Sequence, residues 1–241
     1  MIGMGTLINT AAIVVGGVLG ILFGQLLTQR HQDALIKTCG IGTLFIAVSG
    51  ALEGMLTVSG AHVSGGRSML IVICLAIGAL IGETLNIEDG FERFGQWLKI
   101  KTGNAGDSRF VDGFVTASLT VCIGAMAIVG SIEDGIRGDY SILATKAVLD
   151  FIIIMIMTSS MGKGCIFSAI PVAVFQGAIT VLATLIKPLM TEHALTNLSL
   201  VGSVLIFCVG VNLVWGKKIR VANLLPDILV AVVMAFLPFE L

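Results

Sequence analysis

Long apolar segments dominate the chain and restrict what it can fold into. An α-helix needs about 20 mostly apolar residues to cross the hydrocarbon core of a bilayer. Segments of this kind occupy residues 4–27, 35–56, 68–86, 111–130, 141–161, 165–187, 195–215 and 221–239. None of them alternates polar with apolar residues as the strands of a membrane barrel do. The sequence therefore predicts an all-α polytopic membrane helix bundle of about eight transmembrane helices.

Composition supports a membrane protein and excludes one class of partner. Charged residues make up 12% of the chain, whereas about a quarter is usual in soluble domains. The formal net charge of -1 provides no basic surface for phosphates, so nucleic acid is not an expected partner. The fourth segment carries Asp112 near its start and the eighth carries Pro226 and Asp227, which leaves seven helices as an alternative count.

The distribution of Lys and Arg predicts the orientation, because cytoplasmic loops are enriched in these residues. With the N terminus outside, ten loop cations lie inside: Arg30, Lys37, Arg93, Lys99, Lys101, Arg109, Lys163, Lys217, Lys218 and Arg220. Three lie outside: Arg67, Arg137 and Lys187. No cation precedes the first segment, so it lacks the basic start of a signal peptide. Both termini are expected outside.

The longest connection, residues 87–110, is expected at the cytoplasmic surface. Four large apolar residues recur in it at helical spacing beside two lysines: Ile87, Phe91, Phe94, Leu98, Lys99 and Lys101. This pattern is typical of a helix that lies in the headgroup region. The segment is interpreted as an anchored connector, with a regulatory or partner-binding role as the alternative.

A weak internal repeat is visible at a shift of 160 residues. The string "IGTLFIAVSG" falls over "VGSVLIFCVG", and Gly17 falls on Gly177. We take the first copy as about residues 4–86 and the second as about 164–239, with helices 4 and 5 (about 111–161) between them. The copies start five helices apart, so the second would be inverted relative to the first. Inverted repeats of this kind are frequent in secondary transporters.

Enzymatic and metal-binding motifs are not found. The chain has no H-E-x-x-H, no G-x-S-x-G and no phosphate-binding G-x-x-x-x-G-K-[ST]. The five cysteines fall in five different apolar segments and make no C-x-x-C, so they are interpreted as small buried residues. We expect no catalytic activity, no cofactor and no metal site.

Two charges within one apolar segment are the most informative polar residues. Lys146 and Asp150 are four residues apart and so share one face of a helix. A charge near the bilayer centre costs at least about 2.5 kcal/mol on insertion scales, so Asp150 should face the bundle interior and meet a partner. Two interpretations stay open: an ion pair that serves only packing, or a binding site for a proton, a cation or a substrate amine.

Other polar residues and two prolines also fall within apolar segments. Asn9, Gln176 and Asn212 could each hydrogen-bond to a neighbouring helix or line a pathway. Pro171 and Pro226 remove backbone donors, so breaks are expected in the sixth and eighth helices. Small residues at a spacing of four, as at Gly16, Gly20 and Gly24, are expected to permit close helix packing.

Several strings resemble those of a known family. These are "GTLINTAAIVVGGVLG", "CIGAMAIVGSIEDG", "KAVLDF", "AIPVAVFQGAIT" and "GVNLVWGKKIRVANLLPDIL". They are similar, over essentially the whole chain, to the bacterial membrane family known as domain of unknown function 554, or YdfK-like. The resemblance implies a multi-pass protein of the prokaryotic inner or plasma membrane and brings no activity with it. By analogy it draws attention to Asn9, Glu133, Asp134, Asp150, Gln176, Asn212 and Asp227.

These patterns favour a secondary transporter of a small polar solute or ion. An oligomeric channel-like pore and a non-transporting membrane scaffold or sensor are the alternatives. The expected partners are the lipid bilayer, a small solute or cation, and, for the pore above all, further copies of the chain. The candidate pathway residues are Asp150, Lys146, Asn9, Gln176, Asn212, Asp227, Glu133 and Asp134.

Overall fold

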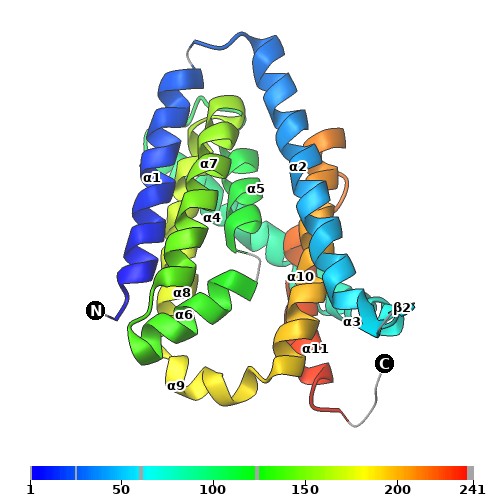
Figure 1. Ribbon diagram of the computed structural model, residues 1–241. Helices are drawn as coiled ribbons and strands as arrows, with labels where there is room; N and C mark the ends of the chain where they lie inside the picture. Colours follow the sequence, from blue (N-terminus) through cyan, green and yellow to red (C-terminus); the bar gives the residue numbers. More distant parts are fainter. Residues whose placement is uncertain (1, 25, 60–61, 123–124, 238–241) are drawn as a thin grey trace.

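Helices of membrane-spanning length make up most of the protein. The computed structural model describes residues 2–24, 26–59, 62–122 and 125–237 (Figure 1). Within these ranges, six helices are long and apolar enough to cross a membrane. They are α1 (Met4–Gly24), α2 (Gln29–Met55), α3 (Ser68–Leu85), α7 (Ser141–Met161), the segment formed by η1 (Lys163–Ser168) with α8 (Ala169–Val181), and α10 (Glu192–Trp215). The prediction of an all-α polytopic bundle is confirmed.

Two of the predicted spans differ from straight membrane-spanning helices. The segment expected over residues 111–130 is divided into α5 (Phe110–Cys122) and α6 (Ala125–Arg137), which are bent by 62°. The segment expected over 221–239 consists of η3 (Val221–Leu224) followed by the short α11 (Pro226–Met234), and its last residues lie outside the described ranges. The described residues therefore contain six spans, or seven if the bent pair is counted as one.

The two prolines have different effects on their helices. Pro226 is the first residue of α11, where its missing N–H costs no helical hydrogen bond. The predicted break in the eighth helix is therefore present and lies at this proline. Pro171 lies in the first turn of α8, and the helix continues through it to Val181. Near Pro171, the change from the 3₁₀ to the α conformation comes before the proline, at Ala169.

Helix α1 packs against α7 in a parallel orientation, through glycines. A Cβ on Gly16 would lie 2.6 Å from the carbonyl oxygen of Phe151, and a Cβ on Gly24 would lie 2.9 Å from that of Ser159. Gly20 faces a third α7 carbonyl between them. Glycine spaced by four thus lets the two backbones touch, as the sequence pattern predicted.

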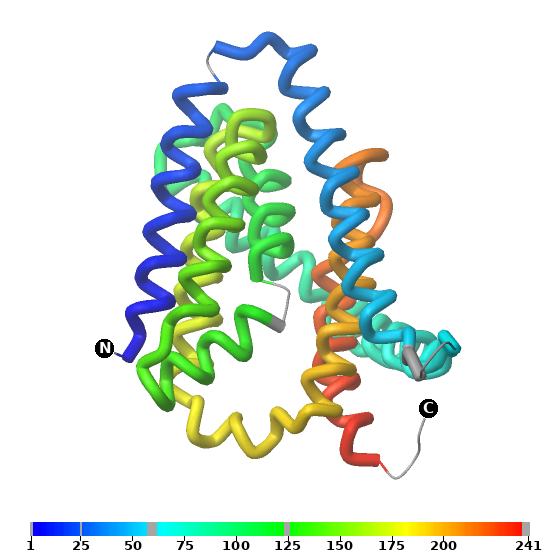
Figure 2. Tube along the Cα trace, viewed as in Figure 1, coloured from blue at the N-terminus to red at the C-terminus, as the bar shows by residue number. Residues whose placement is uncertain are grey.

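Helix α2 packs against α10 in an antiparallel orientation. A Cβ on Gly40, early in α2, would lie 2.9 Å from the Cβ of Leu213, late in α10. A Cβ on Gly54, near the end of α2, would lie 2.8 Å from the Cβ of Leu200, early in α10. The tube view shows the consequence: α1 and α7 stand together on one side and α2 and α10 on the other (Figure 2).

The start of α1 and the end of α11 lie at the same end of the molecule, at the bottom of Figure 1. The turn from α1 to α2 lies at the opposite end, at the top. Figure 1 thus places the two ends of the described chain as the predicted topology requires, on one side of the bundle.

Apolar side chains cover the outer surface of the spans. Leu7 of α1 is 65% exposed, Phe45 of α2 is 74% exposed and Leu80 of α3 is 72% exposed. In water such a surface would be unfavourable, whereas in a bilayer it faces lipid tails. The buried core lies instead where α5, η1, α7 and α10 meet, around Phe110 and Phe114.

The segment expected at the surface forms helix α4 (Ile87–Lys101), which packs on α5. Gly95 of α4 faces the Phe114 ring, and Phe94 lies 5.8 Å from the same ring in an edge arrangement. Trp97 stacks on Phe94 and remains half exposed. An antiparallel hairpin of β1 (Leu56–Ser59) and β2 (His62–Gly65) joins α2 to α3. Short elements α9 (Ala183–Ile186) and η2 (Lys187–Leu189) connect α8 to α10.

Candidate functional site

Lys146 and Asp150 form an ion pair inside the bundle. The Lys146 Nζ lies 2.7 Å from Asp150 Oδ1 and 2.6 Å from Oδ2, so the ammonium bridges both carboxylate oxygens. Lys146 is 7% exposed and Asp150 is 3% exposed. Asp150 is the tenth residue of α7, which places it about 14 Å along a helix of roughly 30 Å. The pair is therefore near the middle of the span.

The bend between α5 and α6 supplies a third member of this site. Lys146 Nζ also donates a hydrogen bond of 2.8 Å to the carbonyl oxygen of Val121. Val121 is the penultimate residue of α5, so its carbonyl belongs to the last turn, whose acceptors lack intrahelical partners. A helix that ends within the bundle thus leaves an acceptor free, and Lys146 binds it. We call Lys146, Asp150 and the Val121 carbonyl the ion-pair site.

Two uncharged amides lie near the middle of the bundle without full hydrogen bonding. Asn9 of α1 is fully buried and its amide lies beside the Asp150 carboxylate. Gln176 of α8 is 1% exposed, and neither its amide oxygen nor its nitrogen has a partner. Buried amides normally make hydrogen bonds. Asn9 therefore offers a donor and an acceptor beside the ion-pair site for a further group, and the Gln176 amide offers the same elsewhere in the bundle.

Glu133 and Asp134 lie at the end of the bundle where α1 begins, away from the ion-pair site. Asp134 is fully buried and accepts hydrogen bonds from Gly3 N at 3.1 Å and Gly5 N at 3.0 Å. It caps the first amide groups of α1, which have no partner within their own helix. Glu133 pairs with Arg137 at 3.3 Å, one turn further along α6.

Asp227 lies between α3 and α11, in surroundings unlike those of the other two buried aspartates. It is 0% exposed, and neither carboxylate oxygen has a hydrogen-bond partner apart from a contact with its own backbone amide. Its position in the first turn of α11 favours a negative charge by about 0.3–1 kcal/mol. An unpaired charge in the bilayer costs at least about 2.5 kcal/mol, so the burial penalty is the larger effect.

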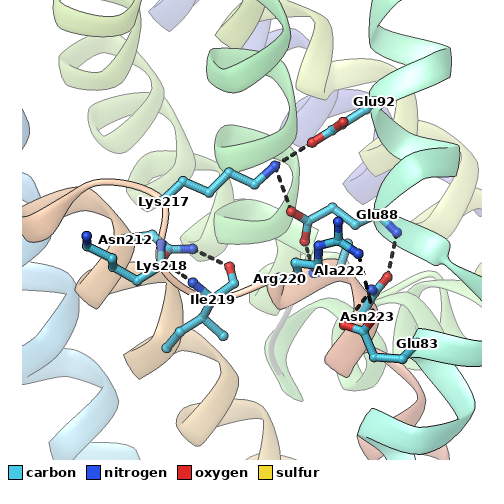
Figure 3. Close-up of polar contacts among 10 residues, drawn as sticks. All are labelled: Glu83, Glu88, Glu92, Asn212, Lys217, Lys218, Ile219, Arg220, Ala222 and Asn223. Carbon is cyan, nitrogen blue, oxygen red and sulfur yellow. Dashed lines mark hydrogen bonds and ion pairs between the residues drawn. The ribbon is translucent and has the colours of Figure 1, made fainter.

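A polar network closes the end of the bundle where α3, α4 and α10 meet (Figure 3). Glu88 is 2% exposed and accepts a hydrogen bond from Ala222 N at 3.2 Å, while its own N–H donates to Asn223 Oδ1 at 2.7 Å. Asn223 in turn donates to Glu83 Oε1 at 2.9 Å. These contacts hold η3 against the junction of α3 and α4.

Lys217 joins this network from the loop that follows α10. It pairs with Glu88 at 2.8 Å and also with Glu92. Burial of the Lys217 ammonium lowers its pKa, but hydrogen bonds and charges of the two glutamates outweigh burial and raise the pKa. The stabilisation is complete below the ordinary lysine pKa of 10.5 and is lost only as the pH rises through the higher folded value. The ion pairs therefore persist at neutral pH.

Asn212 of α10 holds the same loop in shape. Its side-chain oxygen accepts hydrogen bonds from Lys218 N at 2.8 Å and Ile219 N at 3.0 Å, and its side-chain nitrogen donates to the Ile219 carbonyl at 2.7 Å (Figure 3). The structure thus gives Asn212 a complete set of backbone partners at the end of the bundle. Of the eight candidate residues, the structure brings Asn9, Lys146 and Asp150 together. The other five lie apart from this site: Glu133, Asp134, Gln176, Asn212 and Asp227.

A pocket of about 250 Å³ opens at this same end of the bundle. Its polar lining comes from Glu88, Asp112, Thr116, Asn212 and Lys217, and the remaining lining residues are mostly apolar. Leu119 is among the lining residues, and it precedes the Val121 carbonyl by two positions on α5. The pocket therefore reaches along α5 to nearly the depth of the ion-pair site.

Sequence reasoning missed Glu88, Asn223 and Lys217, which had been placed in loops or left without a role. One signal was present for Glu88: it precedes Phe91, Gly95 and Leu98 at helical spacing, and Gly95 and Leu98 are both buried. Nothing in the local sequence indicates that Asn223 or Lys217 lies beside α4, since more than a hundred positions separate them from it.

The fold and the ion-pair site define a multi-pass α-helical membrane protein with charged groups buried between its helices. The family model described as "Protein of unknown function (DUF554)" matches residues 4–236, so the chain belongs to this family, as its sequence motifs indicated.

Two curated proteins are similar to the chain over nearly its whole length. The "Uncharacterized membrane protein YdfK" of Bacillus subtilis (strain 168) is 28% identical over 233 residues, which cover 96% of this chain and 95% of that protein. The "Uncharacterized protein YqgA" of Escherichia coli (strain K12) is 29% identical over 232 residues, which cover 95% and 94%. No solved structure matches.

Proposed function

We propose that the protein is a secondary transporter of a small polar solute or ion, with Asp150 as the residue that binds it. The observation that carries this proposal is the ion-pair site at the bend between α5 and α6. Helices that end within the membrane, together with buried charges, form the substrate and ion sites of many transporters.

The arrangement suits a cationic ligand or a proton. Lys146 occupies the space that an amine or a metal cation would take, between both Asp150 oxygens and the Val121 carbonyl. A ligand that replaces the Lys146 ammonium would find two anionic oxygens, a carbonyl oxygen and the Asn9 amide beside them. Lys146 then acts as a resident counter-ion, which keeps Asp150 paired when the ligand is absent.

Two further features support alternating access. The pocket described above opens at one end and reaches nearly the depth of the ion-pair site, as an entry path from one side would. The directions of the helices also suit the inverted repeat proposed from the sequence, because in Figure 2 α1 runs upward where α8 runs downward, and α2 downward where α10 runs upward. In this proposal residues 4–86 and 164–239 exchange conformations between the two states.

Reconstitution tests the transport proposal directly. We expect proteoliposomes that contain the protein to show charge movement or uptake with at least one member of a panel of amines, amino acids, sodium and potassium. Asp150→Asn should abolish this signal, because it removes the charge and retains the size of the side chain. Asp33→Asn, at an exposed position on α2, is the matched control and should transport normally.

Three results would contradict the proposal. Equal transport by Asp150→Asn and the parent protein would remove Asp150 from the pathway. Conductance that does not saturate with solute concentration would indicate the oligomeric pore instead. No movement of any solute, with protein that is folded by circular dichroism, would leave the scaffold or sensor as the remaining function.

We also propose that the protein resides in the prokaryotic inner membrane with both termini outside, because ten of thirteen loop cations then face the cytoplasm. Alkaline phosphatase fused to the C terminus should therefore be active, and green fluorescent protein at the same position should not fluoresce. An insertion of the fluorescent protein at Gly106, in the exposed connection after α4, should fluoresce. A fluorescent C-terminal fusion would reverse the proposed orientation.

A further inference from the structure

We propose that Asp227 carries an exchangeable proton, in a site between α3 and α11 that is separate from the ion-pair site. This inference rests on the proposed transport function and deepens it, because it names a proton as an ion that the transport cycle binds and releases. It follows from a comparison of the partners of the three most buried aspartates, Asp134, Asp150 and Asp227.

Two of those aspartates have partners that suit a negative charge. Asp134 accepts two backbone N–H groups at the start of α1, and Asp150 is bridged by Lys146. Asp227 is as deeply buried as Asp134, and its oxygens meet neither a cation nor another residue's donor within the described part of the chain. A carboxyl group in such surroundings is stable only in its neutral, protonated form.

The groups that face Asp227 confirm that no cation compensates it. From α3, Gly78 lies against the carboxylate and Cys74 lies nearby; from α10, the titratable neighbour is Cys208. The third packed element, η3, carries no titratable side chain. Both neighbours are thiols, so among the described residues no cationic side chain faces Asp227.

The geometry favours a proton over a metal ion. A Cβ at Gly78 would overlap Asp227 Oδ1, so the carboxylate rests directly on the backbone of α3. Among the described residues, no group of three His, Cys, Asp or Glu side chains is arranged to hold a metal. A proton needs neither additional ligands nor additional space.

The position of α11 makes exchange of this proton possible. Its nine residues span about 14 Å, which is about half the hydrocarbon thickness, and Asp227 is its second residue. The carboxylate is covered on the α3 side by Gly78, a residue without a side chain. In this proposal a displacement of α11 from α3 admits water to Asp227, and an aspartate in water releases its proton at neutral pH.

Labelling with dicyclohexylcarbodiimide tests this inference on the purified full chain in detergent. The O–H of a protonated carboxyl adds across one C=N bond: the oxygen bonds to the central carbon and the proton passes to nitrogen. The adduct rearranges to a stable N-acylurea that peptide mass spectrometry locates. We expect Asp227 to be labelled near pH 6, and labelling to fall several-fold by pH 9 as the proton is lost.

Internal controls make the outcome decisive. The ion-paired Asp150 should remain unlabelled, and Asp227→Asn should remove the label. The inference is overturned if Asp227 of the parent protein is unlabelled at every pH, if its labelling does not change with pH, or if sodium at constant pH suppresses it. The parent protein alone gives these results, so a variant that fails to fold does not obscure them.

The labelling test and the transport test distinguish failure of the proton site from failure of the transport function. If solute moves in proteoliposomes and Asp227 is never labelled, the transport function stands and the proton site is wrong. If no solute moves, the transport function fails whatever the labelling shows, and the inference that rests on it fails as well.

Discussion

Lys146→Met is expected to lower the free energy of unfolding by about 3–5 kcal/mol, the usual cost of leaving one member of a buried ion pair unpaired. In the parent protein, the Lys146 ammonium lies within 2.7 Å of both Asp150 oxygens and 2.8 Å from the Val121 carbonyl. Without this ammonium, the Asp150 carboxylate and the Val121 carbonyl at the end of α5 have no partner in a medium without water. Denaturant or thermal unfolding in micelles of defined detergent measures the effect.

Adding Asp150→Leu to the same chain should restore most of the lost stability, because replacing both charges by apolar groups removes the unpaired carboxylate. The exposed pair of Arg93 with Asp89 provides a control, and Arg93→Met should change stability by less than about 1 kcal/mol. The interpretation is wrong if Lys146→Met costs as little as Arg93→Met, or if the double variant is no more stable than the single one.

Gly82→Ala should destabilise the protein by about 3 kcal/mol or more, at or beyond the upper end of the usual cost of overpacking. The added Cβ would overlap the carbonyl oxygen of Asn223, which is backbone and not the end of a flexible side chain. Nor can η3 withdraw easily, because Asn223 bonds to the Glu88 N–H and to Glu83. Unfolding in detergent and the yield of folded protein are the measurements.

Gly42→Ala is the matched control for this prediction. Gly42 lies in α2, and a Cβ there meets nothing within 4 Å. Alanine has the higher helix propensity, so this substitution should be neutral or stabilising by up to about 1 kcal/mol. Equal effects of the two substitutions would mean that α3 and η3 do not approach as closely as the structure shows.

Much of the fold could be read from the sequence because bilayer helices have a strong signature. The long apolar segments determined the positions of α1, α2, α3, α7 and α10, and the glycine spacing in α1 indicated a close helix contact. The bend after Cys122 could not be read in this way, because "VCIGAMAIVG" is continuously apolar and contains no proline. The short α11 was indicated by Pro226, which begins it.

The candidate site was predictable in part. The spacing of Lys146 and Asp150 determines their pairing, because four residues on a helix place the two side chains together. Their third partner, the Val121 carbonyl, comes from a helix end that local sequence does not reveal. The contrast between Asp134, which is capped, and Asp227, which is not, depends on packing between distant segments. Composition and periodicity carry no information about such packing.

The parallel pairing of α1 with α7 has a consequence for how the protein is made. A ribosome completes α1 at Gly24 and begins α7 at Ser141, so at about 5–20 residues per second the partner arrives roughly 6–23 s later. During that time the glycine face of α1 contacts only lipid and the helices made in between, and for most of it Asp134, which comes shortly before Ser141, has not yet been synthesised to cap the start of α1. Insertion of α1 therefore precedes its packing against α7, and α1 remains in the bilayer without this partner until α7 has been made.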